Sequence, residues 1–391
     1  MTAARRPREF LLDVSRLVWR VWGGRLPTGI DRVCLEYAEH FGARSQAVVQ
    51  FKGSTLVFDP EDSDRLFSIL LRGFGGRGRK SLLFGLGPAA WLKARKAVPR
   101  RGMFYLNVGH TGLDQPKLPA WLARNGLRAI YLIHDLIPIT HPQFCRPGEL
   151  EKHEGRMSNA LGSASGIIGN SQATLDELSD FARARGLPMP PAVVALISGH
   201  HPSLKVTPSK LDRPYFVAIG TIEGRKNHIL LLKLWQRLVA ELGPEAPILL
   251  VIGQRGWEAE SALELLDDRD QWNGAVREIS GADDEELASW LAGARALLMP
   301  SFAEGFGLPV IEALQAGTPV IASDLPVFRE IAGDIPTYLD PSDATAWEAA
   351  IRDFSGATPE RDRQLARIPD FQAPTWRDHF HFVEHWLETL D

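Results

Sequence analysis

The chain has few cysteines and no long apolar run. Its 391 residues include two cysteines, Cys34 and Cys145, too few for a disulfide framework. We expect both to be buried thiols in a reducing cytoplasm. No stretch of about 18 apolar residues occurs, so no membrane-spanning helix is expected. Asp13 and Arg16 interrupt the apolar part of the N-terminus, which therefore makes a better first strand, Phe10 to Val18, than a signal peptide.

Two motifs are also missing. The stretch from Gly220 to His228 lacks G-x-G-x-x-G, which argues against a nicotinamide dehydrogenase. No Asp-x-Asp metal motif stands out. The acidic pairs at 267–268 and 283–284 fall at the ends of predicted helices, where carboxylates act as caps or face solvent. We therefore expect no metal ion and no other cofactor.

The pattern of apolar residues predicts an α/β protein. Strands alternate with helices through most of the chain, which indicates doubly wound parallel sheets. The polar segment His200 to Arg213 carries two prolines and is the best interdomain linker. We predict a first domain over residues 1–205, a second over 206–373, and an amphipathic final helix within 374–391. Phe144 to Leu161 is predicted as one helix.

The most informative stretch is Met299 to Ala313, MPSFAEGFGLPVIEA. It follows a predicted buried strand, Ala294 to Met299, and leads into a helix that begins near Pro309. A glycine-bearing turn between strand and helix directs backbone N–H groups and the positive helix end at one point, which suits an anion. Glu304 lies in the turn, at the rim of the predicted pocket. Glu312 lies one turn into the helix, from where a carboxylate can accept the two hydroxyl hydrogen bonds of a ribose.

Charged residues follow two further predicted strands. Arg225 and Lys226 stand at the entrance of a helix, where two cations and free amides suit a diphosphate. A solvated basic pair is the alternative. His134 and Asp135 lie at the carboxyl end of a predicted strand, where open α/β sheets bind ligands. A histidine at a strand end is, however, more often structural than catalytic.

The string E-G-F-G-L-P-x-x-E-A, which begins at Glu304, resembles the glutamate-x7-glutamate motif of family-4 retaining glycosyltransferases. That family has the GT-B fold, in which two Rossmann-like doubly wound parallel-sheet domains face each other across a cleft. The resemblance implies that Glu304 meets the donor sugar and that Glu312 holds the nucleotide ribose. The amides between them would face the sugar and the diphosphate. These donor-binding candidates are Gly305, Phe306, Gly307 and Leu308.

Other segments extend the resemblance over most of residues 214–335. Ile279 resembles the family's base-contact strand. The family usually shows Gly-Arg and then a Lys five residues after that Arg; Lys226 matches the lysine, but Thr221 stands in place of the arginine. We expect Arg225 to replace it.

The first domain matches the family at fewer positions. His134 and Asp135 resemble the place where a histidine approaches the transferred sugar. Gly29 and Arg32 lie in a glycine-rich loop that enters a helix, and in GT-B enzymes this loop touches the diphosphate or the acceptor. A plain loop is the alternative. In such proteins the closing helix often crosses back onto the first domain, which we expect of residues 374–391.

The resemblance implies a metal-independent hexosyltransferase that retains anomeric configuration, with His134, Asp135 and Glu304 as the catalytic candidates. No carboxylate stands out as a nucleophile, so a front-face transfer is expected. GDP-mannose is the first expected donor, with a UDP- or dTDP-sugar behind it. The acceptor would be lipid-linked or polysaccharide, in bacterial exopolysaccharide or lipopolysaccharide synthesis. The alternatives are a non-catalytic sugar-nucleotide-binding protein of the same fold, and a GT-B phosphorylase or epimerase.

Charge is distributed unevenly along the chain. Residues 1–130 hold 22 Lys/Arg and 10 Asp/Glu, whereas the remainder holds 22 and 38. The stretch Arg72 to Arg101 contains nine Lys/Arg and no acidic residue, with Phe74, Phe84 and Trp91 interleaved. It suits a surface that lies on anionic lipid, or a solvated basic loop. Nucleic acid is not expected, because no binding motif accompanies the charge. A cytoplasmic protein, peripheral at the inner membrane, is the resulting expectation.

Overall fold

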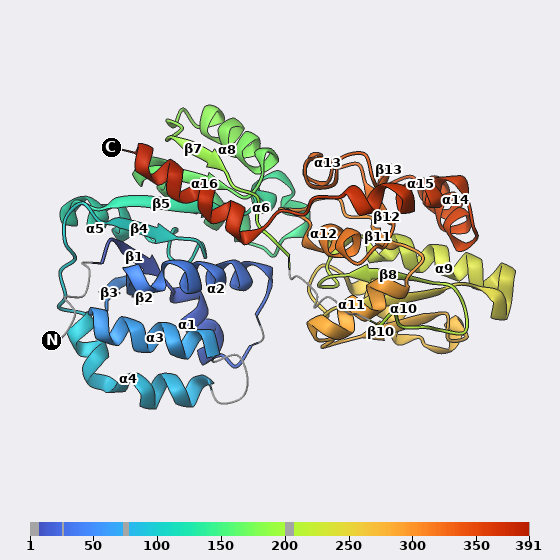
Figure 1. Ribbon diagram of the computed structural model, residues 1–391, viewed down its shortest axis with the longest axis horizontal. Helices are drawn as coiled ribbons and strands as arrows, with labels where there is room; N and C mark the ends of the chain where they lie inside the picture. The colour runs from blue at the N-terminus through green and yellow to red at the C-terminus, as the bar shows by residue number, and fades with distance from the viewer. Residues whose placement is uncertain (1–7, 26, 73–77, 200–206, 391) are drawn as a thin grey trace. The chain divides into compact units, whose positions relative to one another are not determined.

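The computed structural model describes residues 8–25, 27–72, 78–199 and 207–390. The chain forms two compact units, each built around one sheet (Figure 1). The first unit comprises Met1–Leu136, Glu151–Ile197 and Trp376–Asp391. The second comprises Ile137–Leu150 and Ser198–Thr375. The short segment Ile137–Leu150 therefore packs with the second unit although both of its neighbours in the chain belong to the first.

The sheet of the first unit has seven strands in the order β3-β2-β1-β4-β5-β6-β7, and only the edge strand β3 is antiparallel to its neighbour. The strands are β1 (Phe10–Asp13), β2 (Ser45–Phe51), β3 (Ser54–Val57), β4 (Phe104–Asn107), β5 (Arg128–Ile133), β6 (Ala164–Gly169) and β7 (Ala192–Val194). The longer helices are α1 (Ser15–Trp22), α2 (Gly29–Phe41), α3 (Pro60–Arg72), α4 (Gly78–Ala94), α5 (Lys117–Asn125), α7 (Glu149–Ser163), α8 (Gln172–Ala184) and α16 (Trp376–Thr389).

The sheet of the second unit has six strands, all parallel, in the order β10-β9-β8-β11-β12-β13. The strands are β8 (Tyr215–Ile219), β9 (Ile248–Ile252), β10 (Val276–Ile279), β11 (Leu297–Met299), β12 (Val320–Ser323) and β13 (Thr337–Leu339). The longer helices are α9 (His228–Leu242), α10 (Glu260–Asp267), α11 (Asp284–Gly293), α12 (Leu308–Gln315), α13 (Pro326–Ala332), α14 (Ala344–Ser355) and α15 (Pro359–Arg367).

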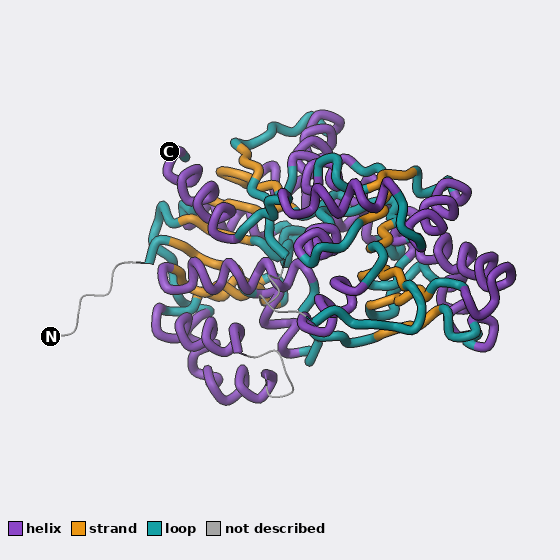
Figure 2. Tube along the Cα trace, turned by 45° about the vertical axis from the view of Figure 1, so that its right-hand side comes forward, coloured by secondary structure: helices purple, strands orange, loops and turns teal. Residues whose placement is uncertain are grey.

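In both units the strands lie among helices (Figure 2), which explains their composition. β8 and β9 are buried at every position, and continuous apolar runs are typical of parallel strands covered on both faces. Three tryptophans, Trp235, Trp272 and Trp347, fill the core of the second unit. Each indole N–H donates to a backbone carbonyl, at 2.8, 3.1 and 3.0 Å respectively. All three indole N–H groups therefore keep a hydrogen-bond partner although the side chains are buried.

The fold class is confirmed: both units are α/β, with the Rossmann-like strand order that reverses at the first strand. This reversal lies between β1 and β4 in the first unit and between β8 and β11 in the second. Ligands in such sheets bind outside the carboxyl ends of the strands at the reversal, because the loops there diverge to opposite faces. The loops that follow these strands are therefore the places to look for a site.

The predicted strand Phe10 to Val18 is wrong in its second half. β1 ends at Asp13, and α1 begins at Ser15. The side chains of Leu17, Val18 and Val21 are buried, a spacing that fits one helical face better than an alternating strand. Because the sequence pattern did not predict this helix, the basic residues of the helix were not identified as candidates.

Two other local predictions also need correction. The predicted helix Phe144 to Leu161 begins only at Glu149, since Pro147 and Gly148, the latter with φ of 83°, interrupt it. Cys34 is buried as expected, but Cys145 is half-buried.

Much of the basic stretch Arg72 to Arg101 is helical and not a loop, because α4 spans Gly78–Ala94. Gly87 (φ 68°) and Pro88 kink it, and Trp91 packs edge-on against Phe58 at 5.1 Å between ring centroids. Phe74 and Arg77 lie outside the described residues, as do the side chains of Arg79, Lys80 and Phe84. Within the described part of the chain, no helix is long and apolar enough to cross a membrane.

The last helix, α16, belongs to the first unit. Figure 1 shows it in red within this unit. Tyr37 donates its hydroxyl to His379 Nε2 at 2.9 Å, and His379 Nδ1 donates to Ala195 O at 3.1 Å. A Cβ at Gly166 would come within 2.5 Å of the Trp386 ring. The absence of a side chain at this position of β6 therefore allows the ring of α16 to pack closely against the strand.

Candidate functional site

The two loops that follow β8 and β11 meet at the reversal of the second sheet. The first contains the short helix Gly224–Lys226 and the second contains Ser301–Gly307. Backbone hydrogen bonds join them: Phe302 N donates to Arg225 O at 2.8 Å, and Arg225 Nη1 donates to Ala303 O at 2.8 Å. The strand order, and not any local motif, brings these segments together.

Four charged side chains form a buried cluster at this point, which we call the charge cluster: Glu223, Arg225, Lys226 and Glu304. Arg225 Nη1 lies 2.8 Å from Glu304 Oε2, and Lys226 Nζ lies 2.5 Å from Glu304 Oε1. Arg225 Nη2 lies 2.6 Å from Glu223 Oε1. Two cations and two carboxylates are thus held in one hydrogen-bonded group. The side chain of Glu304 is only 6% exposed.

The cations control the ionisation of Glu304. Burial on its own would raise the pKa of this carboxyl group, but the charges of Arg225 and Lys226 outweigh it and lower the pKa to about 2. Burial lowers the pKa of Lys226 despite the attraction of Glu304. Ser301 Oγ donates to Glu304 Oε1 at 2.7 Å. Glu304 is therefore a firmly ionised carboxylate that occupies the anion position beside both cations.

Two residues of this region escaped prediction. Burial raises the pKa of Glu223, although Arg225 and Lys226 oppose the effect. His228 begins α9 with Nδ1 buried and without a hydrogen-bond partner among the described residues. Burial and the charge of Lys226 lower the pKa of His228 to about 4, so this imidazole is neutral. Glu223 sits two residues before Arg225, and that proximity was the only available signal.

Glycine at 307 is required by the turn. Gly307 has φ of 110° and is the N-cap of α12. A Cβ there would lie 2.6 Å from Phe328 Cε1. Gly305 and the buried Phe306 precede it, and Leu308 starts the helix. The strand-turn-helix prediction is therefore confirmed, because the turn after β11 leads directly into the N-terminus of α12.

The two remaining donor-site candidates, Glu312 and Ile279, are not members of the charge cluster. Glu312 is half-buried in the second turn of α12, and a Cβ at Gly199 would come within 3.1 Å of Glu312 Cγ. Ile279 ends β10, the edge strand, which β9 separates from β8. Two strand spacings amount to about 10 Å. Ile279 therefore lies two strands away from β8, whose following loop carries Arg225 and Lys226.

Aromatic side chains of the Ile137–Leu150 segment pack against the loops of the charge cluster. Phe144 stacks on Phe302 with ring centroids 5.2 Å apart and planes at 13°. Arg146 lies over the Trp257 ring at 4.8 Å. A Cβ at Gly224 would come within 3.4 Å of Phe144 Cδ1. This segment therefore supports the loop that carries Glu304.

In the first unit, His134 follows β5 directly, as predicted. Its Nε2 lies 2.8 Å from Val108 O, and only an N–H can donate to a carbonyl, so Nε2 carries the proton. Burial lowers the pKa of His134 to about 4, which makes the imidazole neutral near pH 7 and leaves Nδ1 as an acceptor. Asn170 Nδ2 donates to His134 O at 2.9 Å.

Two further histidines surround His134. Its ring centroid lies 5.0 Å from that of His110, which lies 6.0 Å from that of His153. His110 Nε2 donates to Leu132 O at 2.9 Å, and His153 Nε2 donates to Asp135 O at 3.2 Å. His110 and His153 thus donate to backbone carbonyls at the end of β5, whereas His134 donates to one that follows β4. Among the described residues no cluster of His, Cys, Asp and Glu is arranged to hold a metal ion.

The predicted loop at Gly29 starts α2, and its first turn is strongly charged. Asp31 is buried and accepts hydrogen bonds from Arg16 Nε at 2.6 Å and Arg20 Nε at 2.8 Å. Thr28 and Asp31 form a capping box. Burial opposes the ionisation of Asp31, but Arg16 and the hydrogen bonds lower its pKa.

The neighbouring Arg32 is half-buried on the same turn. The charges of Arg16 and Asp31 also act on His134, so the structure brings the α2 turn and the end of β5 into one region of the first unit. The T-x-x-D spacing was a usable signal for Asp31, whereas the false strand, which ended at Val18, concealed the helix that carries Arg16 and Arg20.

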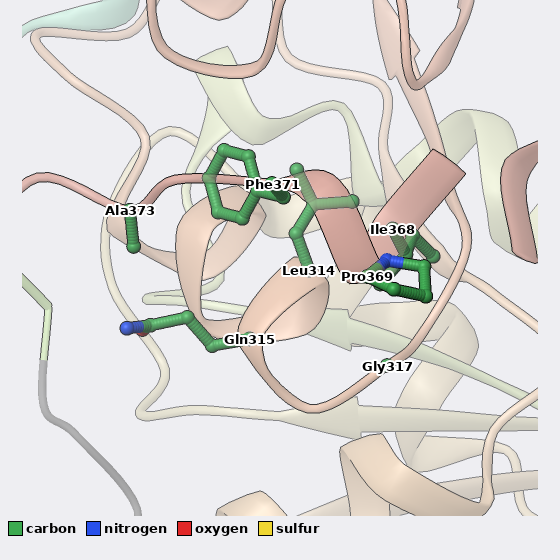
Figure 3. Close-up of a pocket in the computed structure, with 7 residues that line it drawn as sticks. All are labelled: Leu314, Gln315, Gly317, Ile368, Pro369, Phe371 and Ala373. Carbon is green, nitrogen blue, oxygen red and sulfur yellow. The ribbon is translucent and has the colours of Figure 1, made fainter. Parts of the chain in front are cut away.

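The second unit also has a cavity of about 540 Å³ at the other end of α12. Its lining residues are Leu314, Gln315, Gly317, Ile368, Pro369, Phe371 and Ala373 (Figure 3). An eight-residue helix rises about 12 Å from end to end. The cavity is therefore separate from the charge cluster, and these described lining residues carry no charge.

Comparison with known proteins gives these sites a context. Residues 202–367 match the family model described as Glycosyl transferases group 1. An O-antigen chain mannosyltransferase B of Escherichia coli is 30% identical over 248 residues, 57% of this chain and 60% of that protein. A serotype-specific mannosyltransferase WbdA of Escherichia coli is 29% identical over 237 residues, 56% of this chain and 29% of that protein. The chain thus matches less than two thirds of the length of these relatives.

The fold comparison covers more of the chain. The crystal structure of Anabaena HepE in complex with UDP-glucose aligns with a TM-score of 0.65 over 97% of this chain and 99% of that one, at 14% identity. A likeness at this identity speaks for the fold alone. The predicted resemblance is confirmed over residues 202–367, which match the group 1 glycosyl transferase model, and the chain has the GT-B fold.

Proposed function

We propose that this protein is a metal-independent, retaining glycosyltransferase that moves a hexose from a nucleotide sugar to a lipid-linked or polysaccharide acceptor in cell-surface glycan synthesis. GDP-mannose is the proposed donor, since the relatives matched in sequence are named as mannosyltransferases. The observation that carries the proposal is the charge cluster, because Arg225 and Lys226 stand where the group 1 match and the sheet reversal coincide.

The cluster suggests how the donor would be received. In the structure, Glu304 pairs with both cations. A diphosphate is a stronger acceptor for them, because it offers more charge and more oxygen atoms. The arriving diphosphate would bind Arg225 and Lys226 in place of Glu304. The released Glu304 carboxylate could then accept hydrogen bonds from the hydroxyls of the sugar. The hydrogen bond from Ser301 Oγ would hold the Glu304 carboxylate in position within its loop.

Transfer itself needs stabilisation of a leaving diphosphate. Arg225, Lys226 and the amides of the Gly305–Leu308 turn would neutralise the growing negative charge, and electrostatic stabilisation of this kind is usually the largest single contribution to catalysis. In the first unit, neutral His134 can accept a hydroxyl hydrogen bond at Nδ1, and Asp135 can attract a developing positive charge at the sugar. Front-face attack by the acceptor, with its proton passing to the leaving phosphate, gives retention.

Membrane association is part of the proposal. Lys93, Arg95, Lys96 and Arg100 are exposed at the end of α4 and beyond it, and Leu92 is 65% exposed among them. Exposed cations around an apolar side chain suit a surface of anionic lipid, with each cation contributing about 1 kcal/mol. A peripheral position at the inner membrane face would present the acceptor lipid to the first unit.

A thermal-shift panel with GDP, UDP, dTDP and ADP tests the donor assignment. We expect GDP to raise the melting temperature most, since a ligand at 100 times its Kd stabilises by about 2.7 kcal/mol. A larger shift with another base would replace GDP-mannose in the proposal.

Incubation with the preferred nucleotide sugar then tests catalysis. Release of nucleoside diphosphate, increased by a polyprenyl-linked glycan acceptor, is expected. Binding without any release would favour the non-catalytic alternative.

A further inference from the structure

Glu177 is a half-buried carboxylate of α8 that has no part in the function proposed above. It faces the turn that follows β5, where its carboxylate accepts a hydrogen bond from the backbone N–H of Leu136. Two other side chains form hydrogen bonds to the same turn: Asn170 Nδ2 donates to His134 O at 2.9 Å, and Thr174 Oγ1 donates to the same oxygen at 3.5 Å. Thr174 and Glu177 are three residues apart and share one face at the start of α8, whereas Asn170 lies between β6 and this helix.

The surroundings of Glu177 contain an unfavourable charge. Burial, followed by the charge of Asp135, raises the pKa of Glu177 to about 7, and the Leu136 N–H only partly offsets this. From the other elements, His134 is neutral and His153 of α7 donates to Asp135 O. On α8 itself, Asp176 and Asp180 are exposed. The charge that acts on Glu177 is thus a carboxylate of the candidate site.

We propose that Glu177 is a positioning residue of the sugar-transfer site: it holds the His134–Leu136 turn through Leu136 N–H and, while protonated, places no second negative charge beside Asp135. This inference rests on the proposed function of His134 and Asp135. The proton of Glu177 stays on its own carboxyl group and takes no part in the transfer. Loss of that proton sets two carboxylates against each other and loosens the turn.

The kinetic test separates the two roles of the side chain. In Glu177→Gln the amide oxygen still accepts from Leu136 N–H, but the group carries no charge at any pH. We expect the wild-type kcat to fall as pH rises through about 7 and the Gln variant to lack that limb. At low pH, where the wild-type side chain is protonated, Glu177→Ala should lose kcat about fivefold, as for one buried hydrogen bond, with little change in the KM of the donor; like the Gln variant it should lack the falling limb. Asp176→Asn, on the exposed side of α8, is the matched control and should follow the wild type.

A stability measurement tests the same inference without activity. A carboxyl group whose pKa is raised by folding destabilises the protein as pH rises from its unfolded value of 4.5 to about 7. The melting temperature of Glu177→Gln minus that of the wild type should therefore increase between pH 5 and pH 8, while Asp176→Asn shows no such trend. A flat difference would overturn the inference. If Glu177→Gln is active and its kcat shows the same pH profile as the wild type, the inference is also overturned. A wild-type protein that is inactive but still shows the trend in melting temperature would count against the proposed function alone.

Discussion

At the scale of single residues, Glu304 is the centre of the charge cluster because it pairs with two cations, Arg225 and Lys226. Glu223 adds a second carboxylate on Arg225. Burying a charge without a partner is costly, and this explains why the cluster is preassembled. Under the proposed function, a diphosphate that binds these cations must displace a carboxylate from them.

We expect Lys226→Ala and Arg225→Ala each to weaken nucleoside diphosphate binding by about 1.5–3 kcal/mol, because each loses a charge-assisted contact to phosphate. Calorimetric titration measures the effect. Arg255→Ala is a suitable control, since Arg255 lies in the same unit but pairs with Asp267 and Glu278 at the surface. Unchanged affinity in both site variants would place the diphosphate elsewhere.

The two glutamates of the motif should behave differently. Glu312→Ala is expected to weaken the nucleotide, because a ribose contact is lost. Glu304→Ala should spare or tighten the free nucleoside diphosphate, since its removal leaves Arg225 and Lys226 available, yet it should abolish transfer. Affinities by calorimetry and rates of donor turnover decide this. Equal effects of the two substitutions would contradict the division of roles.

The depressed pKa of Glu304 predicts a pH dependence of stability. The group titrates at about 2 in the folded protein against 4.5 when unfolded, so its contribution is complete above about pH 5 and is lost as pH falls towards 2. Relative to Glu304→Gln, the wild type should lose about 1 kcal/mol of unfolding free energy between pH 6 and pH 3.5. Urea unfolding at both pH values provides the measurement, and a constant difference would contradict the ion pairing.

At the scale of elements, the turn before α12 determines where the amides point. Gly307→Ala should destabilise the protein by about 1–3 kcal/mol, because φ of 110° is unfavourable for alanine and its Cβ would clash with Phe328. Gly317, which follows the same helix, has φ of 78°, and a Cβ on it would meet no described atom within 4 Å. Gly317→Ala should therefore cost less. Urea unfolding of both variants compares them, and equal losses would show that the clash has no effect.

The same arrangement of side chains occurs at the ends of β5 and β11. In each unit a residue after one strand is held by side chains that follow a neighbouring strand: His134 by Asn170, which follows β6, and Glu304 by Arg225 and Lys226, which follow β8. The arrangement depends on the parallel sheet, because only parallel strands deliver all their carboxyl ends to one edge. Packing of Phe144 on Phe302 adds support at the second of these edges.

At the scale of the whole molecule, the charge distribution predicts reversible membrane binding. We expect sedimentation with anionic but not neutral liposomes, and its loss at high salt, because the Debye length is about 8 Å at physiological ionic strength. Changing Lys93, Arg95 and Lys96 to Gln should weaken this binding and leave nucleotide affinity intact. The same change at Arg124, Arg183 and Arg185, which are exposed elsewhere in the first unit, is the charge-matched control. Wild-type protein that stays in the supernatant at low salt would favour a soluble acceptor.

The sequence by itself determined the α/β class, the strand-turn-helix at 299–313 and the positions of His134, Arg225 and Lys226 after their strands. These features are local, since apolar periodicity and glycine placement depend on neighbours within a few residues. It also led to the glycosyltransferase resemblance, which is carried by a short string whose spacing is fixed by one turn. The missed helix α1 shows the limit, because a short apolar run is also consistent with a strand buried on both faces.

Only the tertiary structure decided which charges meet. Glu304 lies 78 residues after Lys226, and the β8-β11 pairing that joins their loops depends on the packing of the whole sheet. The same is true of Glu177, which faces Leu136 because α8 packs against β6, the neighbour of β5. Such contacts, and the pKa shifts that follow from them, arise from burial and long-range pairing, and neither is written in the local order of residues.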